Sequence, residues 1–288
     1  FLGDSAEAAE AVKALMEEDS RVSGLLDGTY TQRMDEWDRS ALLEDAIEAS
    51  QGINRDAFRL YKAGSQGALT VGAAYLDSLN VTEGVKGIYL GHVNEVWGWL
   101  PEGEHASLLD PDLCTTPSLS AWCGVFMGSL FIREEQWAKA GALREALRAE
   151  SNRRLAEDPA ADVEFLQSGA RFLSAYEDLH RGNLRAAEPI LRGMTTRPDV
   201  IGGRARLAMG EWEAAQGHTD EAIRHYQASL HGYQRPRAVL ELARLHEAAG
   251  RTGEALDYWN RLLVTTRSGD QDLPQVSEAK EAVARLTQ

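Results

Sequence analysis

Three segments in the second half of the chain repeat one pattern of residues at a nearly constant interval. Each has a glycine, an alanine five positions later, and a large apolar residue four positions beyond the alanine. Successive alanines lie 35 and then 33 residues apart. The three sets are Gly182, Ala187 and Leu191; Gly217, Ala222 and Tyr226; and Gly250, Ala255 and Trp259. Such a period is typical of a protein built from copies of one small structural unit.

The pattern predicts a helix–turn–helix hairpin in each copy. Glycine suits the turn, a small residue allows two helices to touch, and a large apolar residue one helical turn further on fills the space beside it. The first helices of the hairpins are expected over 165–180, 200–216 and 236–249. An amphipathic stretch over about 275–286 is expected to cover the last hairpin, because a terminal repeat has no further neighbour.

This C-terminal part, about residues 131–288, resembles the tetratricopeptide family, whose units are about 34 residues long. It also looks like the tetratricopeptide tails of bacterial regulators such as serine/threonine kinases and adenylate cyclases. The resemblance implies an all-α fold, a tetratricopeptide-like right-handed superhelix of antiparallel helix hairpins with a C-terminal capping helix. It also implies a role in contacts with other proteins.

The rest of the chain is predicted to be helical around one long irregular segment. Residues 1–100 form an N-terminal helical region, which is either a set of degenerate repeats or a helical cap. Residues 101–117 form a long loop or elbow. Residues 118–288 hold the repeats, with a helix expected over 132–149 and an insertion up to Pro159 that interrupts the period. Further helices are expected near 4–18, 20–35, 38–51, 53–64, 66–79 and 82–98.

The charge of the chain narrows the choice of partners. Its formal net charge is −15, from 45 acidic and 30 basic residues, and residues 1–50 alone carry −9. Because nucleic-acid binding rests on neutralising phosphates, nucleic acid is an unfavourable partner.

No apolar run reaches the roughly 18 residues that a membrane-spanning helix needs. The first residue is Phe1 rather than Met, which gives a slight preference for an exported, processed protein over a cytoplasmic one.

We find no pattern that indicates catalysis, a cofactor or a metal. Gly84, Gly87 and Gly91 have a spacing that suits a packed helix and not a phosphate-binding loop. The histidines His218, His225 and His231 lack the pairing of a metal site. Cys114 and Cys123 are the only cysteines, and the sequence leaves open whether they form a disulfide or stay as two buried thiols.

The leading hypothesis for function is a non-catalytic scaffold that associates with copies of itself through the ends of the solenoid, into a ring, a tube or a filament. Possible interface residues are Trp97, Trp99, Arg144, Arg148, Arg153 and Arg154. The alternative is a module that binds a client peptide, or a regulatory region of a larger bacterial protein. An acidic client would meet arginines on the first helices of the repeats, namely Arg171, Arg204, Arg206, Arg237 and Arg244.

Overall fold

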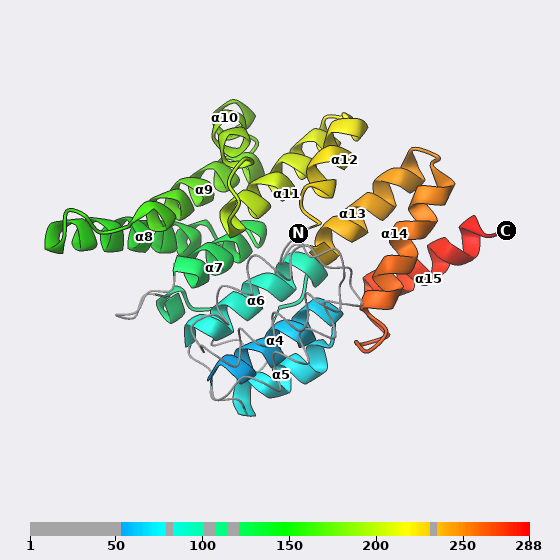
Figure 1. The fold of residues 1–288 in the computed structure, drawn as a ribbon, viewed down its shortest axis with the longest axis horizontal. Coiled ribbons are helices and arrows are strands. Elements are labelled where there is room, and N and C mark those ends of the chain that lie inside the picture. Colours follow the sequence, from blue (N-terminus) through cyan, green and yellow to red (C-terminus); the bar gives the residue numbers. More distant parts are fainter. Residues whose placement is uncertain (1–52, 79–82, 101–107, 115–120, 231–234) are drawn as a thin grey trace, which may run out of the picture.

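The computed structural model describes residues 53–78, 83–100, 108–114, 121–230 and 235–288, and every regular element within these ranges is a helix (Figure 1). This confirms the all-α fold class. The helices predicted before residue 52 lie outside the described residues. The elements are α4 (Ile53–Gln66), α5 (Leu69–Ser78), α6 (Glu83–Trp97), the short 3-10 helix η2 (Pro111–Cys114), α7 (Ala121–Arg133), α8 (Trp137–Glu157), α9 (Glu164–His180), α10 (Leu184–Met194), α11 (Val200–Ala215), α12 (Thr219–Gln227), α13 (Arg235–Ala248), α14 (Thr252–Thr265) and α15 (Pro274–Leu286).

Consecutive helices pack against each other along the chain. The pairs α7 and α8, α9 and α10, α11 and α12, and α13 and α14 are each joined by a short turn and are in contact, and α15 packs on α14 (Figure 1). The helices expected over 165–180, 200–216, 236–249 and 275–286 therefore agree with α9, α11, α13 and α15 to within two residues at each end.

The three predicted turn glycines share one backbone geometry. Gly182, Gly217 and Gly250 have positive φ angles of 79°, 76° and 70°. After each glycine, the next N–H donates a hydrogen bond to a carbonyl five residues back, at 2.8 to 2.9 Å. This arrangement satisfies the last carbonyls of a helix and favours glycine, which has no side chain to clash at positive φ. The bonds run from Asn183 to Asp178, from His218 to Glu213 and from Arg251 to His246.

The small and large residues of the repeat lie where helices touch. Ala187, Ala222 and Ala255 are fully buried, and Tyr226 and Trp259 are almost so. The ring of Tyr226 packs on Gly210 of the preceding helix so closely that a Cβ there would lie 2.8 Å from it. A glycine on one helix thus accommodates the large residue on the next.

The same turn recurs at two places where we did not predict it. Gln136 donates its N–H to the carbonyl of Phe131 at 2.7 Å, and Ala68 donates to the carbonyl of Ala63 at 2.9 Å. The residues at positive φ are Glu135 (55°) and Gly67 (70°). Five positions beyond them stand the buried Ala140 and Gly72, as in the other repeats. The hairpins α4–α5 and α7–α8 therefore share the turn of the three C-terminal hairpins.

This turn corrects one predicted boundary. The helix expected over 132–149 is interrupted at Glu135, so that α7 ends at Arg133 and α8 begins at Trp137. α8 then continues to Glu157, and its length accounts for the interruption of the period before Pro159. Within the predicted elbow over 101–117, residues 108–114 are described and include the short helix η2.

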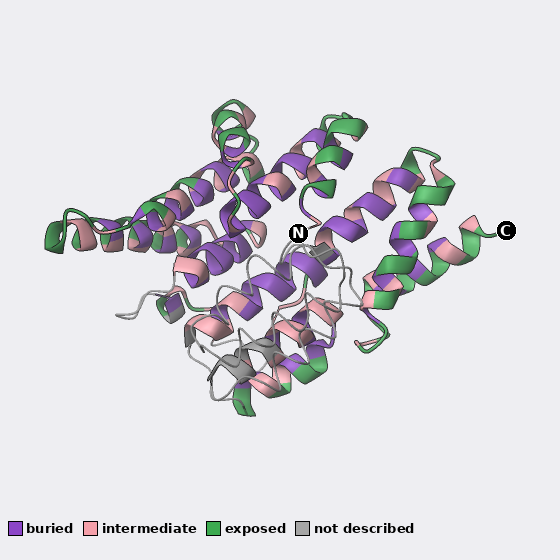
Figure 2. Ribbon diagram, in the orientation of Figure 1, coloured by how far each residue is buried: buried purple, intermediate pink, exposed green. Residues whose placement is uncertain are grey.

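The core runs through the middle of the helical array (Figure 2). In α7 every residue from Cys123 to Ile132 is buried, because α6, α8 and α9 all pack on it. α6 also contacts α13, and the turn after α14 lies against the turn between α4 and α5. The α14–α15 turn is therefore in contact with the first described hairpin.

Candidate interaction surface

Alternating charges run from helix to helix across the repeats. We call this set the charge ladder, and its members in order are Arg133 of α7, Glu211 of α11, Arg237 and Glu241 of α13, Arg244 of α13 and Glu278 of α15. Each of these side chains keeps between 16% and 39% of its surface exposed. The ladder is therefore within reach of a molecule that binds across these helices.

The links of the ladder differ in length. The Arg244 guanidinium lies 2.6 Å from Glu278 and 3.0 Å from Glu241, and Arg237 lies 3.0 Å from Glu241. Glu211, by contrast, lies 3.8 Å from both Arg133 and Arg237, beyond hydrogen-bond distance. The ladder is thus loosest at Glu211, where it passes from α11 to α13.

A buried ion pair lies beneath the same helices. Nη2 of Arg204 in α11 donates to Oε2 of Glu95 in α6 at 2.9 Å, and the two side chains are 1% and 7% exposed. The guanidinium carbon lies 4.0 Å from the centre of the Phe126 ring. Among the described residues, Nε and Nη1 of Arg204 have no hydrogen-bond partner. Burial raises the pKa of the Glu95 carboxyl, and the Arg204 charge offsets part of that rise.

The two tryptophans proposed as interface anchors lie in different surroundings. Trp97 is 4% exposed, and its indole N–H donates to the carbonyl of Gly64 at 2.6 Å, so it joins the end of α6 to α4. It is a core residue and not an exposed anchor, which leaves Trp99 as the candidate of the two. Trp99 is partly buried and packs against the core.

The four arginines of α8 proposed as a basic interface already form ion pairs within the chain. The pairs are Arg144 with Glu177 at 2.6 Å, Arg148 with Glu145 at 2.6 Å, Arg153 with Glu150 at 2.8 Å and Glu157 at 2.7 Å, and Arg154 with Glu150 at 2.7 Å. Exposed pairs, such as Arg148 with Glu145, contribute about 0 to 1 kcal/mol each. The surface of α8 is thus charge-compensated and not simply basic.

The arginines proposed to meet an acidic client are also mostly occupied. Arg204 is buried against Glu95, and Arg237 and Arg244 belong to the charge ladder. Arg206 donates to two backbone carbonyls on the loop before α11. Arg171 is exposed. These five side chains therefore do not make a groove of uncompensated positive charge.

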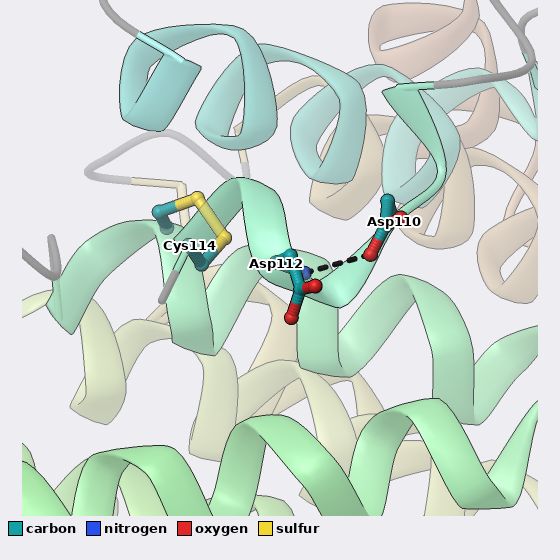
Figure 3. The surroundings of a disulfide bond; sticks show 4 residues. Asp110, Asp112 and Cys114 are labelled. Carbon is teal, nitrogen blue, oxygen red and sulfur yellow. Dashed lines mark hydrogen bonds between the residues drawn. A yellow bond between two sulfur atoms is a disulfide. The ribbon is translucent and has the colours of Figure 1, made fainter. Parts of the chain in front are cut away.

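Cys114 and Cys123 form a disulfide that ties η2 to the start of α7 (Figure 3). Their Cα atoms lie 5.5 Å apart, and both residues are buried. Close by, the N–H of Asp112 donates to the carboxylate of Asp110 at 2.9 Å, which shapes the turn into η2 (Figure 3). Of the two states that the sequence leaves open, the structure has the bridged one.

We expect loss of this disulfide to lower the free energy of unfolding by about 2–3 kcal/mol, since a short cross-linked loop restricts the unfolded chain. The Cys114→Ser/Cys123→Ser variant should show this loss in urea denaturation. Adding a reductant should lower the midpoint of the natural chain and leave that of the variant unchanged. A natural chain whose midpoint stays constant after its thiols have been shown to be free would contradict the prediction.

The histidines of the described part of the chain lie apart from any metal-binding group. No group of three His, Cys, Asp or Glu side chains there is placed to hold a metal ion. His218 instead lies 2.8 Å from Glu213, and burial lowers the pKa of His225. His231 lies outside the described residues. None of the described helices is both long enough and apolar enough to span a membrane.

Comparisons with known proteins leave the chain without an identified relative. No protein-family model matches it. Neither the curated proteins nor the solved structures contain a match.

Proposed function

We propose that this chain is a non-catalytic helical-repeat scaffold for protein–protein interaction, with its hairpins arranged as a tetratricopeptide-like right-handed superhelix. The observation that carries the proposal is the recurrence of one turn, with a positive φ of 55° to 79° and the same hydrogen bond, at residues 67, 135, 182, 217 and 250. Stacked hairpins of this kind form extended surfaces, and such surfaces commonly bind polypeptides.

We place the binding surface along the charge ladder. It crosses four helices, its side chains are partly exposed, and its acidic and basic members alternate. A partner segment that itself carries both signs of charge would pair with it residue by residue, whereas a purely acidic segment would meet Glu211, Glu241 and Glu278. This favours a mixed-charge client over the acidic client expected from the arginines alone.

Self-association through the ends of the solenoid stays a prediction with less support. The turn after α14 already lies against α4 and α5 of the same chain, which leaves less free surface at that end. The acidic residues 1–50 that would form the other contact lie outside the described residues. A place within a larger bacterial protein likewise stays a prediction.

The experiment is a selection from a display library of peptides with mixed charge, followed by affinity measurements on the peptides that are enriched. We expect the Glu211→Gln/Arg237→Gln variant to bind them about tenfold more weakly, as loss of charged hydrogen bonds at an interface predicts. Arg261→Gln is the matched control, because Arg261 pairs with Asp257 on α14 and is not part of the ladder. Equal affinity of the natural chain and the ladder variant would refute binding at the ladder.

Light scattering across a range of concentrations separates this proposal from self-association. A client-binding scaffold should keep the mass of a monomer at every concentration. Regular particles whose mass grows with concentration would instead favour assembly of copies through the solenoid ends.

A further inference from the structure

The turn between α14 and α15 reaches across to the N-terminal helices. We call residues 266–275 the C-terminal turn. The carboxylate of Asp270 accepts hydrogen bonds from the N–H and the hydroxyl of Thr70, at 2.9 and 3.0 Å. Thr70 lies in the first turn of α5, whose N–H groups have no partner within the helix. Asp270 therefore caps α5 from 200 positions away along the chain.

Three further contacts hold the C-terminal turn in place. The N–H of Asp270 donates to the carbonyl of Gly67 at 3.0 Å, and the side-chain amide of Gln275 donates to the carbonyl of Trp97 at 3.0 Å. A Cβ on Gly269 would lie 2.1 Å from the carbonyl oxygen of Gln66, so only glycine fits at that position. The ends of both α4 and α6 are thus bound by one short segment.

This junction differs in kind from the packing elsewhere. Its bonds are polar, and those of Asp270 to Thr70 are exposed to solvent. α6 and α7, in contrast, pack closely at Gly91, which lies on the fully buried Phe126. The C-terminal turn adds one apolar contact, in which the partly buried Leu273 lies beside Gly67 and the Trp97 ring. A junction of exposed hydrogen bonds and one partly buried apolar side chain opens at a lower free-energy cost than a fully buried apolar interface.

The charge ladder also runs from helices that precede α13 onto α13 and α15. Arg133 and Glu211 belong to α7 and α11, whereas the rest of the ladder belongs to α13 and α15, which the C-terminal turn helps to position. The two parts are linked by the 3.8 Å contact of Glu211 with Arg237. A shift of α13 to α15 away from α4 to α6 would therefore change the spacing of the ladder at its loosest link.

We propose that the C-terminal turn is a latch, which closes α13–α15 onto α4–α6 and thereby sets the spacing of the charge ladder. A partner that spans both parts of the ladder then binds the latched state more tightly, and its binding stabilises the latch by the same free energy. The coupling to a partner rests on the proposed function. The latch itself does not depend on it.

Hydrogen exchange with mass spectrometry tests the latch in the free protein. In the Asp270→Ala/Gln275→Ala variant we expect the amides at the start of α5 to exchange about fivefold faster, which is the typical effect of losing a helix cap. The exposed turn around Arg267 should also be cut sooner by trypsin. Asp272→Ala is the matched control, since Asp272 is exposed in the same turn and has no hydrogen bond or ion pair with any described residue. Unchanged exchange in the double variant, or equal acceleration in the control, would overturn the latch.

Peptide affinity then tests the coupling. A mixed-charge peptide selected on the natural chain should bind the double variant more weakly, and its affinity should fall by the same factor as the latched fraction of the protein. An unaltered affinity in a variant whose exchange shows an open latch would overturn the coupling. Failure of the natural chain to bind any library peptide would count against the proposed function, and the exchange experiment would still decide the latch.

Discussion

Replacing Glu95 with glutamine should lower the free energy of unfolding by about 3–5 kcal/mol, because the substitution leaves a buried guanidinium without its anionic partner. Arg204 is 1% exposed and makes its one hydrogen bond among the described residues to Glu95. It cannot turn to solvent without leaving its place over the Phe126 ring. Urea denaturation of the two proteins measures the difference. Glu281→Gln, at an exposed position on α15, should change stability by less than about 0.5 kcal/mol.

A double-mutant cycle separates the interaction of the pair from the cost of burying it. We expect Glu95→Gln/Arg204→Met to be more stable than Glu95→Gln alone, because methionine fills much of the arginine's volume and carries no charge. Burial raises the pKa of the Glu95 carboxyl, the direction expected where desolvation opposes the ionised form. Additive effects of the two substitutions would mean that the two side chains do not interact.

The second large effect is expected at Gly91, where α6 lies directly on the backbone of α7. A Cβ at this position would stand 2.6 Å from both the carbonyl carbon and the oxygen of Phe126. Because the obstacle is backbone and not the end of a flexible side chain, the helices would have to move apart. We expect Gly91→Ala to cost about 3 kcal/mol, at the upper end of the range for overpacking.

Gly193→Ala provides the control for this substitution. Gly193 is also helical, in α10, and a Cβ there meets nothing within 4 Å. Alanine should therefore stabilise the helix by about 0.5–1 kcal/mol through its higher propensity. Thermal or urea unfolding of both variants gives the comparison, and a Gly91→Ala variant as stable as Gly193→Ala would contradict the packing of α6 on α7.

The sequence reveals the helix hairpins wherever their signal is local. Each turn glycine, the alanine five positions on and the large residue beyond lie within ten residues of each other, so one stretch of chain contains the whole pattern. Gly67 and Gly72 show the same signal, but it has no neighbouring copy that would reveal a period. The nearest further copy of this turn is at Glu135, 68 positions along the chain. Glu135 itself could not be recognised, because glutamate rarely adopts positive φ and its conformation depends on the helices on either side.

The candidate surface depends on contacts between residues far apart in the chain. Whether Trp97 faces solvent or Gly64, and whether Arg204 meets a client or Glu95, follows from the angles at which helices cross. Helical periodicity shows which residues share a face of one helix, but not which other helix covers that face. Spacing also could not decide between a disulfide and two thiols at Cys114 and Cys123.

The sequence by itself therefore determined the all-α class, the places of the C-terminal hairpins and their capping helix, since helix formation and turn chemistry depend on neighbours within about five residues. Only the tertiary structure decided which charges pair and how the chain closes. Glu95 and Arg204 are 109 positions apart, and Thr70 and Asp270 are 200 apart. Pairs at such separations arise from the packing of whole helices, so no local pattern announces them.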